Sequence, residues 1–331
     1  MKRIRLKINT EKSIAEGFDE FIDRCISKNL RPATLKHYTY GWKQISRYID
    51  VNIKIRSISK KTFNDVIVAM KRDNITNQTL YTYARDLKTI LYFFMEQDYM
   101  ERFKVELPKV DTKPIEPYTE EDIEKLVTKP NKKCSFTQYR NWCITCFILS
   151  TGLRLSSVTN VKIKDIDLYQ SLIYVQHTKN RKPLIIPLNK EINKILKDWL
   201  KVRQHTSKEE YLFCNVFGKQ LTKTAITQAL NLYNKERGVD TTGIHRLRHT
   251  FAKQWVLGGN SVVALQKILG HSSLAITQHY VNIMLTDLEE DVNNNNILMR
   301  FSHKYIRKWF SKYKNYDEWN EKYLMSYRNM V

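Results

Sequence analysis

Residues 269 to 280 read LGHSSLAITQHY, a stretch that starts at Leu269 and closes on the phenol of Tyr280. One of its imidazoles belongs to His271, which follows a glycine. Further upstream, residues 245 to 249 read HRLRH, and residues 151 to 154 read TGLR. Arginine, histidine and tyrosine therefore recur in short blocks, in this order, along the C-terminal two thirds of the chain.

These residue types suit chemistry on a phosphodiester. A guanidinium group keeps its charge at any working pH and matches phosphate oxygens as a two-pronged donor. Histidine can donate a hydrogen bond to phosphate or accept a proton. A tyrosine can hold a phosphoryl group as a covalent intermediate. The blocks therefore predict phosphoryl transfer through a phosphotyrosine.

The three blocks resemble the signature of the tyrosine recombinase family, which includes phage integrases and Xer-type recombinases. The resemblance covers the C-terminal two thirds of the chain, and the order and spacing of several blocks make it specific. It implies six catalytic residues, namely Arg154, Lys179, His245, Arg248, His271 and Tyr280. Tyr280 would be the nucleophile, and His249, which adjoins Arg248, would be a supporting residue.

The family's lysine lies on a β-hairpin between the first arginine and the H-x-x-R pair. Residues 172 to 188 read LIYVQHTKNRKPLIIPL, in which two apolar, β-branched runs flank a polar tip, as in a hairpin. Lys179 is the better match at this tip, and Lys182 is the alternative.

The family often has an acidic residue three positions after the first arginine, where this chain has Ser157.

The charge balance indicates a polyanionic partner. The chain has 331 residues, with 56 Lys and Arg against 34 Asp and Glu, which gives a formal net charge of +22. Such a surplus suits nucleic acid better than a small-molecule substrate, although charge alone does not separate DNA from RNA or an acidic membrane face. The sequence shows neither an apolar run of membrane-spanning length nor an apolar segment after its first charges. We therefore expect a cytoplasmic protein that does not enter a membrane.

The five cysteines do not follow a disulfide framework. Cys143 and Cys146 form a C-x-x-C, a spacing that zinc and redox sites use. They lie inside an apolar stretch, residues 142 to 149, and no second C-x-x-C supplies the remaining ligands. Core packing is the favoured interpretation, and we expect neither a metal site nor a cofactor.

The chain is expected to have a mainly α fold with a small β-sheet (α+β), arranged as two DNA-clamping domains. Residues 1–105 predict a small helical DNA-binding domain, and residues 106–117, with three prolines, an extended linker. Residues 118–290 predict the catalytic domain, whose first helix would follow Thr119 as N-cap. Residues 291–331 form a tail with aromatic residues at near-helical spacing. The tail either folds back on its own domain or docks on a neighbouring subunit.

Two predicted helices of the first domain carry basic and aromatic residues opposite their apolar stripes. One begins at Pro32, which is acceptable in a first turn, and its apolar positions are Leu35, Tyr38, Trp42, Ile45 and Ile49. The other directs Leu80, Ala84, Leu87, Leu91 and Phe94 inward. Seven residues on the outer faces are candidate DNA contacts: Lys36, Tyr40, Lys43, Arg47, Tyr81, Arg85 and Lys88. The alternative is that these faces are merely solvated, but the interleaved tyrosines favour DNA contact.

The resemblance implies a site-specific recombinase that acts on double-stranded DNA without a metal ion or ATP. It also implies a homo-tetramer at synapsis and allows an accessory protein. The role can be that of a mobile-element integrase or of a Xer-like resolvase. Two other classes are alternatives: a type IB topoisomerase, which has a similar residue set, and a DNA-binding regulator without catalysis. Site-independent relaxation of supercoiled plasmids would indicate the topoisomerase.

Overall fold

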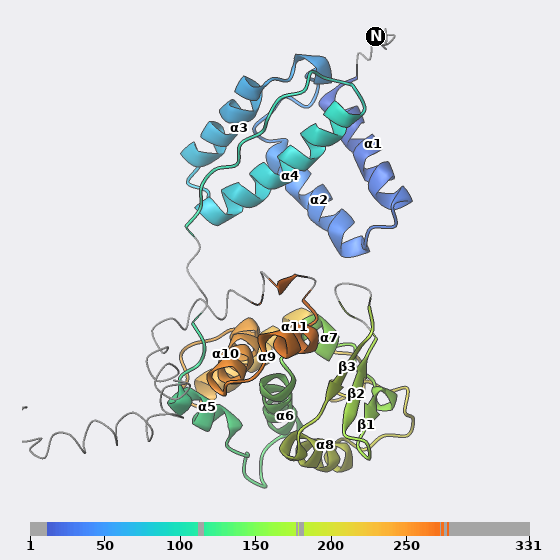
Figure 1. Ribbon diagram of the computed structural model, residues 1–331, viewed down its shortest axis with the longest axis vertical. Helices are drawn as coiled ribbons and strands as arrows, with labels where there is room; N and C mark the ends of the chain where they lie inside the picture. The colour runs from blue at the N-terminus through green and yellow to red at the C-terminus, as the bar shows by residue number, and fades with distance from the viewer. Residues whose placement is uncertain are drawn as a thin grey trace, which may run out of the picture. The chain divides into compact units, whose positions relative to one another are not determined.

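The computed structural model describes residues 12–111, 116–176, 178, 182–271, 273, 274 and 277. The chain divides into two compact units, Met1–Pro114 and Ile115–Val331. In the part described, the first unit is built from helices alone, and the second combines helices with a small sheet (Figure 1). The mainly α fold with a small β-sheet is therefore confirmed.

The first unit is a bundle of four α-helices and a short 3-10 helix. Their bounds are α1 (Ile14–Ser27), α2 (Pro32–Ile45), η1 (Ile55–Ser57), α3 (Lys60–Arg72) and α4 (Asn77–Glu96). The 20-residue helix α4 contacts each of the other three α-helices. All five positions predicted to face inward on α4 are buried. On α2, Trp42 is only partly buried and stacks on Phe18, with ring centroids 4.7 Å apart.

Helix α2 starts at Pro32 as predicted but ends before its predicted apolar stripe does. The chain turns after Ile45, so that the carbonyl groups of Val51 and Ile53 accept hydrogen bonds from the first backbone N–H groups of α1. Those N–H groups have no partner inside their own helix, and this turn supplies one. Ile49 still packs against the core of the unit, although it lies outside the helix.

The second unit surrounds one central helix. Its helices are α5 (Glu120–Val127), α6 (Phe136–Thr151), α7 (Leu155–Val158), η2 (Ile163–Asp165), α8 (Lys190–Arg203), α9 (Lys223–Glu236), α10 (Ile244–Leu257) and α11 (Val262–Leu269). Helix α6 contacts α5, α8, α9 and α10 and is buried along most of its length. Thr119 is the N-cap of α5 as predicted, because its hydroxyl accepts a hydrogen bond from the N–H of Asp122 at 3.1 Å.

The predicted hairpin is present as the antiparallel strands β2 (Leu172–Val175) and β3 (Leu184–Pro187). A third strand, β1 (Ile166–Asp167), pairs with β2 and gives the order β1-β2-β3. The sequence did not predict β1, since two residues are too few to show an alternating pattern. Strand β3 contacts α11, and a Cβ atom at Gly270, the cap of that helix, would lie 3.6 Å from the side chain of Leu184, the first residue of β3.

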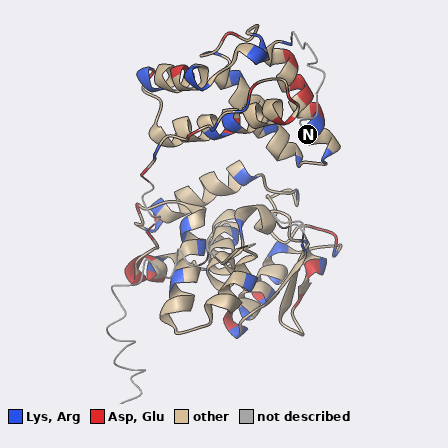
Figure 2. Cartoon of the chain, turned by 45° about the horizontal axis from the view of Figure 1, so that its top comes forward, with Lys and Arg blue, Asp and Glu red and all other residues tan. Residues whose placement is uncertain are grey.

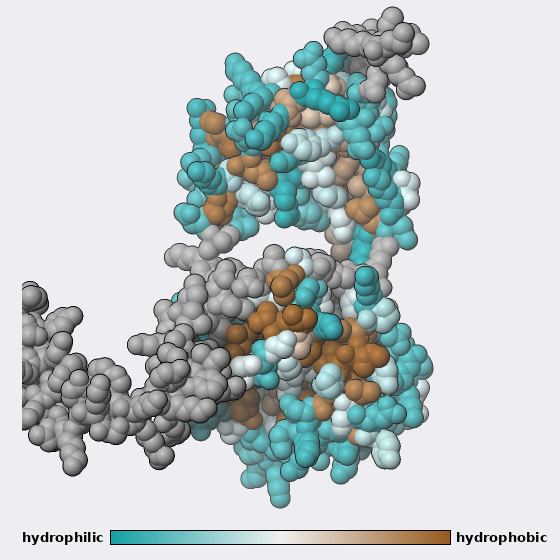
Figure 3. Space-filling model, in the orientation of Figure 1, coloured by the Kyte–Doolittle hydropathy of each residue, from teal (hydrophilic) through white to brown (hydrophobic). Residues whose placement is uncertain are grey.

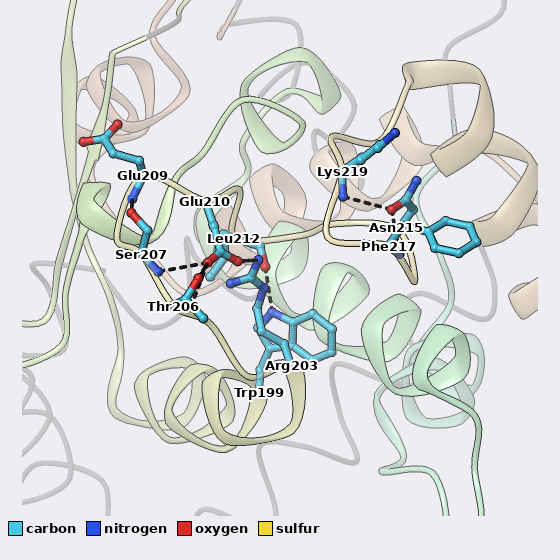
Figure 4. A network of polar contacts seen from close by, with 10 residues as sticks. All are labelled: Trp199, Arg203, Thr206, Ser207, Glu209, Glu210, Leu212, Asn215, Phe217 and Lys219. Carbon is cyan, nitrogen blue, oxygen red and sulfur yellow. Dashed lines mark hydrogen bonds and ion pairs between the residues drawn. The ribbon is translucent and has the colours of Figure 1, made fainter.

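The loop after α8 is held by a polar network, drawn in Figure 4. Glu210 accepts hydrogen bonds from the backbone N–H groups of Thr206 (2.8 Å) and Ser207 (2.9 Å), and it pairs with Arg203 at 2.9 Å. Chiefly because of the two backbone bonds, the pKa of Glu210 falls to about 2. The indole of Trp199 donates to the carbonyl oxygen of Leu212 at 2.9 Å. The loop is thereby fixed against α8.

Candidate active site

Arg154 and Arg248 come from distant parts of the sequence and meet at one backbone oxygen. Arg154 is the N-cap residue of α7, and Arg248 lies near the start of α10. The Nη1 of Arg154 donates to the carbonyl oxygen of Leu269 at 3.2 Å, and the Nη2 of Arg248 donates to the same oxygen at 2.9 Å. The structure thus brings together the two arginines that the sequence predicted.

Two helix ends offset the charge of these arginines. Arg248, which is 5% exposed, also donates from Nη1 to the carbonyl oxygen of Gly152 at 2.7 Å. Gly152 caps the C-terminus of α6, and Leu269 is the last residue of α11. The carbonyl groups at a helix C-terminus carry partial negative charge, so they stabilise a buried cation there. Gly152 and Gly270, the cap of α11, both adopt the left-handed conformation that commonly ends helices.

His271 contacts Arg248 and a buried threonine. Its Nε2 lies 2.7 Å from the Nη2 of Arg248, and its Nδ1 lies 2.8 Å from the Oγ1 of Thr277. Burial, then the charges of Arg248 and Arg154, lower the pKa of His271 to about 4. The ring is therefore neutral at neutral pH.

His245 belongs to the same cluster of charges. It lies three residues before Arg248 on α10, so the two side chains share one face of the helix. Burial lowers the pKa of His245, and the charges of Arg248 and then Arg154 lower it further. A neutral imidazole beside two cations can accept a proton at neutral pH.

Two of the six predicted catalytic residues, Lys179 and Tyr280, lie outside the described residues. The alternative lysine, Lys182, is exposed, and its carbonyl oxygen accepts a 2.6 Å hydrogen bond from the hydroxyl of Thr178. Ser157, at the position where the family often has an acidic residue, is buried in α7.

The site also contains groups that the sequence did not predict. Thr277 follows His271 by six residues, which is not the spacing of neighbours on a helix, and is 0% exposed. The carbonyl groups of Gly152 and Leu269 are backbone atoms, which no side-chain motif reveals. Only the left-handed glycine after α6 gave a signal, since a Thr-Gly pair at the end of an apolar run is typical of a helix C-terminus.

The seven candidate DNA contacts lie on α2, α4 and the turn after α2. Lys36, Tyr40, Lys43, Arg47 and Arg85 are exposed, whereas Tyr81 and Lys88 are half-buried. The ammonium group of Lys88 lies 5.2 Å from the ring centre of Tyr92. Lys and Arg are spread over the helices of this unit, with acidic residues among them (Figure 2). The structure is therefore compatible with both interpretations of these faces.

A contact between His37 and a buried carboxylate joins the two helices that carry these candidates. Asp86 on α4 is 2% exposed and lies 2.9 Å from the Nε2 of His37 on α2. Burial raises the pKa of Asp86, and the contact with His37 lowers it. A Cβ atom at Gly41 would lie 2.9 Å from the carboxylate, so only glycine leaves room for this approach. The pair fixes α2 against α4.

The C-x-x-C lies in the core as expected. Cys143 is 0% and Cys146 is 6% exposed on α6. Burial raises the pKa of both thiols, that of Cys146 to about 12, so they stay protonated. Among the described residues, no group of three or more His, Cys, Asp or Glu is placed to hold a metal ion. None of the described helices has the length and apolar character needed to span a membrane.

The surface of the second unit is partly apolar. Figure 3 shows apolar side chains gathered on the face of this unit that carries α10 and α11 in the view of Figure 1. Leu257, at the end of α10, and Val263, on α11, are 44% and 53% exposed.

The sequence is similar to known proteins over most of its length. Residues 117–285 match the model of the phage integrase family. The tyrosine recombinase XerA of Pyrococcus furiosus is 30% identical over 292 residues, which cover 87% of this chain and 97% of that protein. The XerA of Thermococcus kodakarensis is 27% identical over 84% of this chain and 93% of its own length.

Solved structures share the fold at lower identity. The Tn1549 transposon integrase in complex with transposon right end DNA superposes with a TM-score of 0.69 at 20% identity, covering 81% of this chain and 94% of that one. A lambda integrase tetramer bound to a Holliday junction gives 0.67 at 15% identity, covering 82% and 78%. With the family model matching half of the chain and a relative at 30% identity over most of it, the chain belongs to the phage integrase family of tyrosine recombinases.

Proposed function

We propose that this chain is a site-specific DNA recombinase that cuts and rejoins strands through a 3′-phosphotyrosine at Tyr280. The observation that supports this most directly is the convergence of Arg154, Arg248 and His271 at the end of α11. His245 is a fourth member of this cluster, because burial and then the charges of Arg248 and Arg154 lower its pKa. Membership of the tyrosine recombinase family supports the same reaction.

The two guanidinium groups would neutralise the non-bridging oxygens of the scissile phosphate. A phosphodiester repels nucleophiles, and its charge grows towards the transition state, so charges fixed in advance lower the barrier most. In a site that excludes water such groups contribute several kcal/mol each, by order of magnitude. The carbonyl oxygen of Leu269 accepts hydrogen bonds from both Arg154 and Arg248, which holds the two guanidinium groups together.

The phenolic oxygen of Tyr280 would form a bond to phosphorus while the bond to the 5′-oxygen breaks. His245, neutral at neutral pH, would accept the phenol proton, and Lys179 would protonate the leaving 5′-oxygen. Exchange of one phosphoester for another is nearly thermoneutral, so the reaction needs no ATP. Attack by a free 5′-hydroxyl of a second duplex on the phosphotyrosine would complete the exchange.

The first unit would bind the duplex through the exposed residues of α2 and α4. Strand exchange between two duplexes requires four active sites, and a lambda integrase of the same fold is seen as a tetramer on a Holliday junction. We therefore include a homo-tetramer at synapsis in the proposal. Because its substrate is genomic or mobile-element DNA, the enzyme would act in the cytoplasm, on the nucleoid, with or without an accessory protein.

Covalent trapping tests this proposal and also identifies the target sequence. The full chain is incubated with a library of nicked duplexes, in which the cut strand loses a short fragment and cannot be resealed. Protein-linked DNA is isolated under denaturing conditions and sequenced. We expect adducts at one sequence with the wild type and none with Tyr280→Phe, which should still bind that sequence.

Tyr169→Phe is the matched control, because Tyr169 is 98% exposed on the loop before β2 and has no proposed role. It should form adducts like the wild type. Adducts that persist in Tyr280→Phe would refute the nucleophile, and relaxation of plasmids without the trapped sequence would indicate a topoisomerase.

A further inference from the structure

We propose that Thr277 is a positioning residue: it holds His271 in the tautomer protonated at Nδ1, so that Nε2 accepts a hydrogen bond from Arg248. The effect of Thr277 on catalysis rests on the proposed function. The tautomer of His271 does not, and it can be measured on the protein alone.

The contact with Arg248 decides which nitrogen of His271 lacks a proton. A guanidinium group has only donors, so a 2.7 Å contact between the Nη2 of Arg248 and the Nε2 of His271 requires a lone pair on that nitrogen. If Nε2 carried a proton, that proton would point at a proton of Arg248 across the 2.7 Å contact, which is repulsive. Nε2 is therefore the acceptor, and any ring proton lies on Nδ1.

The neutral ring then has one arrangement that satisfies both nitrogens. Three charged or titratable groups, Arg248, Arg154 and His249, act on His271, and all of them oppose its protonation. The single proton sits on Nδ1 and is donated to the Oγ1 of Thr277, 2.8 Å away. Thr277 is 0% exposed, so water does not replace this acceptor.

This arrangement gives His271 two successive roles. Before DNA binds, it holds Arg248, together with the carbonyl oxygens of Gly152 and Leu269. A bound phosphate brings negative charge to the arginines and so removes part of what disfavours the protonated ring. His271 can then take up a proton at Nε2 and donate it to the phosphate. The bond from Nδ1 to Thr277 persists in both states, so the ring need not turn.

Nitrogen NMR of the full chain tests the tautomer directly. Histidine is labelled with ¹⁵N, and His271→Gln assigns the signals of the missing ring. At neutral pH without DNA, we expect His271 to show a protonated Nδ1 and an unprotonated Nε2. Thr277→Ser, which retains the hydroxyl, should keep this pattern. Thr277→Val, of nearly the same shape, leaves the Nδ1 proton without an acceptor, so the Nε2–H tautomer should become populated, with loss of the contact between Nε2 and Arg248.

A wild-type ring protonated at Nε2 would overturn the proposal, and so would an unchanged pattern in Thr277→Val. The wild-type spectrum decides the tautomer even if the valine variant does not fold. In cleavage assays, Thr277→Val should slow adduct formation by about 10- to 100-fold, as loss of the hydrogen-bond partner that orients a metal-bound histidine typically does. DNA affinity should be unchanged, and Thr277→Ser should react like the wild type.

The two proposals fail in different ways. Absence of adducts in the wild type would refute the recombinase mechanism and leave the tautomer result standing. Normal adduct formation by a folded Thr277→Val variant would refute the positioning role alone.

Discussion

Arg248 donates a 2.7 Å hydrogen bond to the carbonyl oxygen of Gly152, which ties the start of α10 to the end of α6. Gly152 adopts a φ of 62°, a conformation that other residues rarely take. A Cβ atom there would lie 2.5 Å from the ring of Phe251 and 2.7 Å from the side chain of Leu269. One glycine thus gives both the backbone geometry and the space that the arginine site requires.

Gly152→Ala should destabilise the protein by about 2–6 kcal/mol, since backbone strain and overpacking each cost on the order of 1–3 kcal/mol. Urea unfolding measures the change. Gly238→Ala is the control, because Gly238 has a φ of 69° but no atom within 4 Å of the added Cβ. Gly238→Ala should lose only the stability that backbone strain costs. Equal losses of unfolding free energy in the two variants would show that the packing around Gly152 does not matter.

Arg154→Lys and Arg248→Lys should each lower the rate of adduct formation by about 100-fold or more. Lysine keeps the charge but cannot donate two parallel hydrogen bonds to one phosphate. Loss of one such donor lowers the catalytic rate about 100- to 1000-fold in comparable sites. Single-turnover cleavage measures the rate, and a binding assay shows that DNA affinity is retained. Arg102→Lys, at a largely exposed side chain, should react normally. Lysine variants with full activity would show that charge alone suffices.

Stability should fall as the pH drops through the range set by His271. Its pKa is about 4 in the folded protein against 6.5 ordinarily, so between these values the unfolded chain binds a proton that the folded protein does not. The contribution is complete above about pH 6.5 and is lost as the pH falls towards 4. His245, whose pKa is also lowered, acts in the same direction.

Replacing His271 by Gln should therefore flatten the dependence of unfolding free energy on pH between 7 and 5. The difference should be on the order of 1–3 kcal/mol, reduced by solvent screening of the half-buried ring. Urea unfolding at both pH values measures it, with His205→Gln as an exposed control. Parallel curves for the wild type and His271→Gln would contradict the prediction.

Lys43→Ala combined with Arg47→Ala should weaken DNA binding and reduce its dependence on salt. Each lost phosphate contact removes about 0.9 from the slope of log affinity against log salt concentration, so the pair should remove roughly one to two. Fluorescence anisotropy at several salt concentrations measures the slope. Lys61→Ala with Lys71→Ala, two exposed lysines on α3, removes the same charge elsewhere. If the variant of Lys43 and Arg47 keeps the slope of the wild type, these two residues do not contact the phosphates.

Local sequence patterns predicted the local structure well. The apolar stripe from Leu80 to Phe94, the N-cap at Thr119 and the hairpin from Leu172 each follow from spacing that neighbouring residues share. The end of α2 was missed, because it depends on the backbone of α1, far along the chain from Ile49. Local patterns carry no information on such a partner.

The candidate site likewise contains some groups that the sequence predicted and others that it did not. Its arginines and histidines were found from their order along the chain, which resembles a known family. The carbonyl oxygen of Leu269 and the hydroxyl of Thr277 were not, because their roles arise only when α6, α10 and α11 come together. The contact between His37 and the buried Asp86 was missed for a related reason: on a helical pattern, Asp86 looks like a solvated residue.

The burial of the cysteines has a practical consequence for watching this protein at work. Maleimide dyes react with thiolates, and Cys25, Cys143, Cys146 and Cys214 are all buried, leaving Cys134 as the half-exposed one. Replacing Cys134 by serine would give a background with little dye uptake. One new surface cysteine in each unit could then carry a donor and an acceptor fluorophore, and single-molecule energy transfer would follow the two units through a round of strand exchange.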